Sequence, residues 1–351
     1  MKKFIFIQIW MVMLLHSVDL LAQDPLFTQF YNNPVYYNPG QIALNGGYSL
    51  KVHARNQWGP VPGKFNTAHA SFEAMVIPKL AFAVNAYSDV AGQANLRSTG
   101  GYMHYAYRPV ETRNLVFQLG ICGGLINRAV DWSKLVFSDQ LHATEGNVGQ
   151  SAFISPDQRS FSYLDFGTGF SLRFNHQANK YGKGYKKMMM TIGGSAMHLS
   201  MPRDAFFSSD VLPVKFVVNV QVAMLSGETV IAPSIIYENQ RRFQSANIGL
   251  NVIKDALILG VHIRNEVLFY DARRFESLLF NAGVRIPFTE KRQLKLTYSI
   301  DLTLSKLRSA SFGSHELSLV MDWNDRYLME KNFKKRSKKR QYQCPKDFGG
   351  L

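Results

Sequence analysis

The chain has 351 residues, a formal charge of +15, 46% hydrophobic residues and two cysteines. Two cysteines are too few for a disulfide framework, and no apolar run reaches the roughly 18 to 20 residues that a membrane-spanning helix needs. We interpret Cys122 as a small strand residue and Cys344 as a tail thiol, and a bridge between them is the less favoured alternative. The composition therefore excludes a disulfide scaffold and a helical membrane protein.

Residues 1–22 have the pattern of a secretory signal peptide. Lys2 and Lys3 precede a 12-residue apolar run from Phe4 to Leu15, and Ala22 stands at a suitable cleavage point. A run of this length is too short for an uncleaved helical anchor. Residue 23 is Gln rather than Cys, which argues against a lipidated N-terminus. The sequence thus predicts an exported protein.

Residues 23–45 form an arm rich in aromatic residues and proline, with the stretch DPLFTQFYNNPVYYNPG from Asp24 to Gly40. Prolines at 25, 34 and 39 interrupt any regular element, so we expect neither helix nor strand here. The aromatic residues, which are unfavourable in water, are Phe27, Phe30, Tyr31, Tyr36 and Tyr37. The arm is either an ordinary extension ordered by its own barrel or a segment that packs against the periplasmic mouth, the lumen or a partner. We expect it to close or brace the periplasmic mouth.

Residues 46–323 alternate between apolar and polar side chains with the period of a β-strand. Leu294, Leu296 and Tyr298 face one way, for example, and Lys295, Thr297 and Ser299 face the other. The predicted strands are 46–57, 64–76, 79–89, 95–108, 112–127, 160–175, 185–200, 213–225, 229–239, 244–254, 256–267, 275–287, 292–305 and 311–323.

The length and number of the predicted strands decide between two classes of β-protein. A soluble sandwich also alternates, but its strands average about five or six residues, whereas about ten residues cross a membrane when tilted. We therefore predict an all-β fold, a transmembrane antiparallel β-barrel of about 14 strands in the lipid of the outer membrane. Short connections after even-numbered strands predict a periplasmic side there, with both termini periplasmic and the long loops outside.

The sequence lacks a catalytic or metal-binding motif, so we predict no enzyme, no cofactor and no metal. Asp165, Arg173, Arg285 and Asp301 are typical of a polar barrel lumen. Arg55 faces the same polar side, and Trp58 suits a membrane interface beside the turn formed by Pro60 and Gly63.

Residues 324–351 form a basic tail, predicted to be periplasmic. Its run of cations could be a solvated segment or a contact for an acidic partner or anionic polymer, and nucleic acid is disfavoured for an exported chain. The tail residues proposed for partner binding are Lys334, Lys335, Arg336, Lys338, Lys339 and Arg340.

The stretches QDPLFTQFYNNPVYYNPG and RNQWGPVPGKFNTAHASFE, with the basic tail ending in CPKDF, resemble the PorP/SprF family of outer-membrane proteins in Bacteroidota. Gly40 stands where alanine is commoner in that family, and DFGGL extends beyond the usual end. The resemblance implies a part in type IX secretion and gliding motility, as a partner barrel that captures or anchors a secreted adhesin through its C-terminal domain at the translocon. Alternatives are a structural component that contacts the periplasmic ring, and a passive solute channel.

Overall fold

The computed structural model describes residues 24–61, 63, 65–142, 146–147, 149, 151, 160–177, 187–203, 211–265, 275–289, 292–304 and 311–323. The signal peptide predicted for residues 1–22 and the basic tail predicted for residues 324–351 lie outside these residues.

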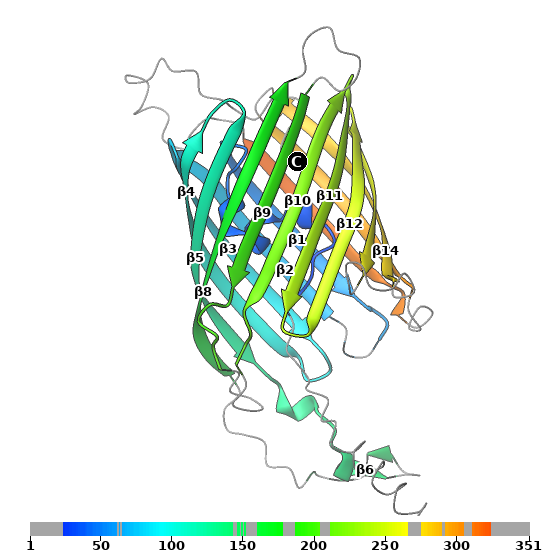
Figure 1. Cartoon of the computed structure of the whole chain (residues 1–351). Helices are drawn as coiled ribbons and strands as arrows, with labels where there is room; N and C mark the ends of the chain where they lie inside the picture. The colour runs from blue at the N-terminus through cyan, green and yellow to red at the C-terminus, as the bar shows by residue number, and fades with distance from the viewer. Residues whose placement is uncertain are drawn as a thin grey trace, which may run out of the picture.

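Within the described residues, fourteen strands form one closed barrel (Figure 1). Each strand pairs antiparallel with its neighbours, and β1 pairs with β16 to close the sheet. The barrel strands are β1 (Tyr48–Gln57), β2 (Phe65–Ile77), β3 (Leu80–Ala91), β4 (Leu96–Glu111), β5 (Leu115–Ala129), β8 (Ser160–Gln177), β9 (Lys187–Met197), β10 (Lys215–Ser226), β11 (Thr229–Gln240), β12 (Phe243–Lys254), β13 (Leu257–Asn265), β14 (Phe275–Thr289), β15 (Arg292–Thr303) and β16 (Ser314–Trp323). Closure leaves the barrel without an unpaired edge strand.

The predicted strands are confirmed, and their ends shift by three residues or fewer, as at the start of β5. A small hairpin between β5 and β8 was not predicted. It consists of β6 (Leu141–His142) and β7 (Gly146–Asn147), and Figure 1 shows β6 away from the barrel. Among the described residues, no helix is long and apolar enough to cross a membrane.

The two faces of the barrel wall differ in polarity, as the alternation predicts. Ile121, Leu164 and Phe216 point outward and are exposed, whereas their neighbours Asp165 and Lys215 point inward and are buried. An apolar outer band and a polar interior are the features of a barrel that sits in lipid.

The two ends of the barrel differ in their connections. At one end, here called the turn end, two residues join β2 to β3, β10 to β11 and β12 to β13. At the other, here called the loop end, thirty residues separate β5 from β8 and nine separate β13 from β14. The loop end also carries the two-residue turn Arg241–Arg242, so its connections are long on the whole but not everywhere.

We predict that the turn end faces the periplasm and the loop end the cell exterior. In a Cys344→Ser background, Gln93→Cys in the β3–β4 connection should react with a membrane-impermeant maleimide on intact cells, because this exposed residue lies at the loop end. Glu228→Cys in the β10–β11 turn should react only after the outer membrane is permeabilised. If intact cells show labelling of Glu228→Cys but not of Gln93→Cys, the barrel has the opposite orientation.

Candidate functional site

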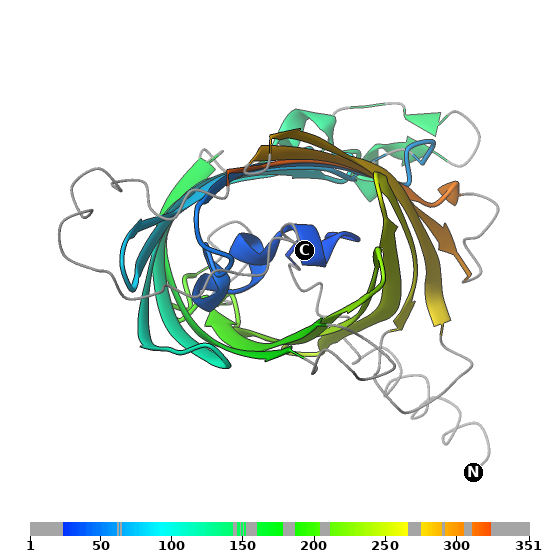
Figure 2. The same ribbon diagram turned by 90° about the horizontal axis from the view of Figure 1, so that it is seen from above.

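The arm lies inside the barrel lumen (Figure 2). The prediction that it has no regular structure is corrected, because it forms three single turns, η1 (Phe30–Asn32), α2 (Pro34–Tyr37) and η2 (Pro39–Gln41). Proline has the backbone angle of a helical first turn and needs no donor there, so Pro34 and Pro39 begin two of these turns. The prolines that exclude a strand therefore start local helical turns.

The arm runs along the lumen from the loop end to the turn end. Asp24 contacts Lys215, the first residue of β10 at the loop end, whereas the carbonyl of Leu44 accepts a hydrogen bond from Arg173 near the turn end of β8. The arm therefore extends beyond the mouth formed by the short turns, which it was expected to close or brace, and passes through the lumen. Asp24 and Trp323 lie at opposite ends of the barrel. The periplasmic placement of both termini stays a prediction.

At the loop end, Asp24 joins a cluster of charges. Its carboxylate lies 2.7 Å from His198 Nε2 and 3.6 Å from Lys215 Nζ. The other ring nitrogen of His198 lies 2.7 Å from Asp165, and Lys215 lies 2.8 Å from Glu238. Each cation is thus held between an arm carboxylate and a wall carboxylate, so the cluster fixes the start of the arm to the barrel.

The charges of this cluster shift the pKa of two groups that lie outside the strands. Burial alone would lower the pKa of His198, but the charge of Asp24 and hydrogen bonds with Asp165 and Asp24 raise it to about 10. Burial alone would raise the pKa of Asp24, but the charges of His198 and Lys215 hold it below its usual range. At neutral pH both groups are charged and attract each other.

Deeper in the lumen, the backbone of the arm meets a buried set of charges. Arg55 lies 2.8 Å from Asp301 and 3.5 Å from Glu316, and its guanidinium also donates to the hydroxyl of Thr28. The backbone N–H groups of Thr28 and Gln29 donate to the Glu316 carboxylate at 2.6 and 3.3 Å. Because a buried charge is costly unless its hydrogen bonds are made, the arm completes this part of the wall.

The aromatic side chains of the arm pack as one buried cluster. Four of them are buried, and Tyr36 is half-buried against them. Phe27 packs edge-on against His53 at 5.7 Å, and Tyr31 stacks on His262 at 5.5 Å. Lys215 lies 5.4 Å from the centre of the Tyr36 ring, within the range of a cation–π contact. The wall therefore binds an aromatic peptide through histidine rings and a lysine.

Three glycines of the wall allow the η2 turn to lie against it. A Cβ atom at Gly120 would overlap the carbonyl oxygen of Pro39, and one at Gly169 would overlap the side chain of Asn38. A Cβ atom at Gly193 would lie 2.5 Å from Gln41 Nε2. Absence of a side chain lets two backbones approach closely, so these positions define where the arm contacts β5, β8 and β9.

The arm also depends on a glycine of its own. A Cβ atom at Gly40, where the resembled family more often has alanine, would lie 2.7 Å from the backbone of Phe170. The carbonyl of Gly40 accepts a hydrogen bond from Gln118 at 3.1 Å. In this chain the arm therefore lies closer to β8 than an alanine would permit without movement.

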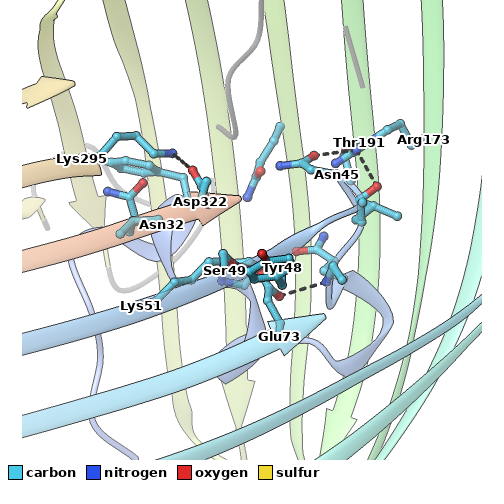
Figure 3. A pocket seen from close by; sticks show the side chains of 18 residues that line it. Asn32, Asn45, Tyr48, Ser49, Lys51, Glu73, Arg173, Thr191, Lys295 and Asp322 are labelled. Carbon is cyan, nitrogen blue, oxygen red and sulfur yellow. Dashed lines mark hydrogen bonds and ion pairs between the residues drawn. The ribbon is translucent and has the colours of Figure 1, made fainter. Parts of the chain in front are cut away.

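Below η2, the arm narrows the lumen at the turn end. A small polar cavity of about 50 Å³ remains there, and Figure 3 shows charged side chains around it. Lys51 pairs with Glu73 at 2.5 Å, and Lys295 pairs with Asp322 at 3.4 Å. The cavity has room for a few water molecules.

The structure brings six of the predicted site residues together. The aromatic residues of the arm and Arg55 all lie in the lumen, which matches the alternative of an extension ordered by its own barrel. Their role in binding a partner stays a prediction. Trp58 lies apart from them at the loop end, half-buried, with its ring 5.5 Å from that of Phe65. The six basic residues of the tail lie outside the described residues.

Several residues that hold the arm were not predicted. Gln118 and Arg108 donate to arm carbonyls, and Ser195 donates to the carbonyl of Tyr37 at 2.6 Å. The alternation in their strands places the side chains of Gln118 and Arg108 on the inward face, so the sequence could have indicated both as lumen residues. His198 follows the last residue of β9, where the alternation has ended, so no sequence signal indicated it.

The described residues contain no group of three or more His, Cys, Asp or Glu side chains arranged to hold a metal ion. Cys122 is a free, buried cysteine in β5. Cys344 lies outside the described residues.

Comparison with known proteins identifies the family. Residues 20–321 match the family model of the type IX secretion system membrane protein PorP/SprF. No curated protein sequence matches significantly.

Solved structures with a similar fold include several barrels. The toluene transporter TodX of P. putida is 9% identical with a TM-score of 0.44, over 84% of this chain and 94% of that one. The CymD monoaromatic hydrocarbon channel is 9% identical with a TM-score of 0.41, over 83% and 91%. The translocator domain of the autotransporter NalP from Neisseria meningitidis is 10% identical with a TM-score of 0.36, over 80% and 89%. At such values the likeness says nothing about function.

We predict that the arm blocks ion flow through the barrel. The complete protein should give no stable conductance in a planar bilayer, because arm residues fill the lumen from Asp24 to Leu44. A variant that lacks residues 24–44 should give stable open currents. A variant with Phe166→Ala on the outer face of β8 serves as the control and should stay silent. Equal conductance of the complete and shortened proteins would contradict the blocking role.

We also predict that His198 makes the stability of the protein depend on pH. The pKa of His198 is higher in the folded protein than in the unfolded chain, so its charge stabilises the folded state fully below about pH 6.5. This contribution is lost as the pH rises through about 10. The His198→Gln variant should be less stable at pH 6.5 by about 2 to 4 kcal/mol, because the two carboxylates lose their cation. Thermal unfolding in detergent at a series of pH values measures this difference.

The difference between wild type and His198→Gln should shrink as the pH rises from 6.5 to 10. The other titratable groups are the same in both proteins, so the comparison isolates His198. Stability curves that stay parallel over this interval would show that His198 carries no such charge.

Proposed function

The chain belongs to the PorP/SprF family of type IX secretion system membrane proteins, and we propose that it is a non-enzymatic outer-membrane partner barrel of this system. It captures or anchors a secreted cargo protein, such as an adhesin, by the C-terminal domain of the cargo. The anchored cargo is thereby kept at the translocon and the cell surface.

The occupied lumen is the observation that carries this proposal. The arm contacts the wall near both ends of the barrel. Asp24 forms an ion pair with Lys215, and the carbonyl of Leu44 accepts a hydrogen bond from Arg173. A conduit for a cargo chain or for solutes would have to break the buried contacts of Arg55, Asp301 and Glu316 with the arm. Leaving such groups without partners is costly. This argument favours capture at an end of the barrel over passage through it.

The loop end is the better candidate for the cargo contact. The thirty-residue connection between β5 and β8 belongs to this end and includes the hairpin of β6 and β7. Long connections on a rigid barrel are the usual carriers of binding function. The turn end, with its two-residue turns, offers less surface of this kind.

A second candidate role is supported by the position of the last strand. β16 ends at Trp323 beside Tyr48, the first residue of β1 at the turn end, with ring centres 5.2 Å apart. The basic run from Lys334 to Arg340 follows in the sequence. If the turn end is periplasmic, this run suits an acidic partner there, including a ring component of the machinery or an anionic polymer.

The capture role is tested in cells that lack the protein. We expect one or a few type IX cargo proteins to be lost from the surface or released into the medium, as measured by quantitative mass spectrometry of both fractions. Wild-type protein should restore display. A variant with residues 132–158 replaced by a short Gly-Ser linker should not, because it lacks the β5–β8 connection.

The matched control inserts the same linker into the β10–β11 turn between Gly227 and Glu228 and should restore display. Normal surface display of every type IX cargo in the deletion strain would refute the capture role. Deletion of residues 331–351 tests the second candidate role in a pull-down of the tagged protein. If the shortened protein still recovers ring components, the tail does not make that contact.

A further inference from the structure

A second cavity lies at the loop end, between the start of the arm and the barrel wall. Its volume is about 390 Å³, and Asp24, Pro25 and Tyr36 of the arm line one side of it. The opposite side comes mainly from β3 and β4, with single residues of β2, β5, β8 and β9 and the first residues of β10. It is therefore separate from the small polar cavity at the turn end.

The lining of this loop-end cavity combines aromatic rings with polar and charged side chains. Six rings contribute to it, those of Tyr36, Tyr37, Phe65, Tyr87, Tyr102 and Tyr163. Polar and charged side chains such as Asp24, Arg128 and Lys215 lie among them, and ligand sites likewise combine apolar walls with directional polar contacts. The composition is that of a binding site rather than of a packing defect.

One polar group in the lining has an unused hydrogen-bonding atom. His104 is 1% exposed, and its Nε2 lies 3.1 Å from Asn85 Oδ1. Its Nδ1 has no partner among the described residues.

The arm itself shows which chemistry this wall accepts. The neighbouring lumen holds a proline-containing peptide through aromatic contacts, such as Phe27 with His69 at 5.9 Å. Lys215, which lines the cavity, also lies over Tyr36 and Tyr37 of the arm. The cavity is thus the unfilled continuation of a surface that already binds aromatic peptide.

The size of the cavity agrees with this class of ligand. An apolar cavity of about 150 Å³ holds one benzene ring. The loop-end cavity, at about 390 Å³, has room for one tyrosine or phenylalanine side chain and its adjoining peptide groups. Lys215 and His198 lie beside Asp24 in the lining, which suits the polar backbone of such a segment.

We propose that the loop-end cavity binds an aromatic side chain of an extended segment of the cargo protein. This inference rests on the proposed function and adds to it the place where the cargo contacts the barrel. The peptide segment enters beside the arm, its ring lies among the tyrosines, and the arm stays in the lumen. The barrel then recognises its cargo with a surface made jointly by wall and arm.

The binding test uses the complete purified protein and two acetylated, amidated pentapeptides, Asn-Pro-Tyr-Asn-Pro and Asn-Pro-Ala-Asn-Pro. Saturation-transfer NMR should give at least about tenfold tighter binding of the tyrosine peptide, because it alone buries a ring. Maltohexaose serves as a carbohydrate probe and should bind no better than the alanine peptide. Equal binding of the two peptides, or tighter binding of maltohexaose, would overturn the proposal.

Two variants locate the binding at the cavity. Ala91→Phe places a ring into it, and Tyr163→Leu removes one of its rings, so each should weaken binding of the tyrosine peptide about tenfold or more. Ala86→Phe, on the outer face of the same strand as Ala91, is the matched control and should bind as wild type. Unchanged binding by both cavity variants would place the site elsewhere and overturn the proposal.

The same variants separate this inference from the proposed function. In cells, Ala91→Phe and Tyr163→Leu should reduce surface display of the cargo, and Ala86→Phe should not. Normal display with both cavity variants, in a strain where deletion of the whole protein abolishes display, would overturn the cavity as the contact and leave the capture role standing.

Discussion

The structure depends on one constraint, which is that charged groups inside a closed barrel need partners. Arg55, Asp301 and Glu316 are buried in the lumen, and the arm supplies backbone N–H groups and a hydroxyl to them. In return the wall supplies Gln118 and Arg108 to the carbonyl groups of the arm. Each part thus satisfies buried polar groups of the other, so barrel and arm pack as one unit.

The same constraint explains why the aromatic residues lie where they do. Phe27 and Tyr31 contact histidine rings of the wall, which present flat surfaces and also carry polar atoms. Gly120 and Gly169 have no side chain at the points where the arm comes close to the wall. Aromatic contacts, polar partners and small wall residues therefore fix the arm in one position, and this position leaves a larger cavity at the loop end than at the turn end.

The barrel could be predicted from the sequence because its cause is local and repeated. Alternation of side chains marks each strand, as in residues 294–305, and every strand repeats the signal. The position of the arm could not be predicted in the same way, because it depends on contacts between distant residues, such as Thr28 with Asp301 and Gln41 with Asn219. Arg55 was correctly placed in the lumen from its parity, but parity does not reveal that its partners come from β15, β16 and the arm.

The direct connection between the arm and β1 has a consequence for biogenesis. The arm contacts β8, β9, β10, β15 and β16, and β1 pairs with β16 to complete the cylinder. Threading a peptide with bulky rings into a finished, narrow cylinder would require the buried ion pairs to open. Placing the arm against the growing sheet first, and joining β1 to β16 last, avoids that obstacle. The path of the arm therefore favours pairing of β1 with β16 as the last step of barrel closure.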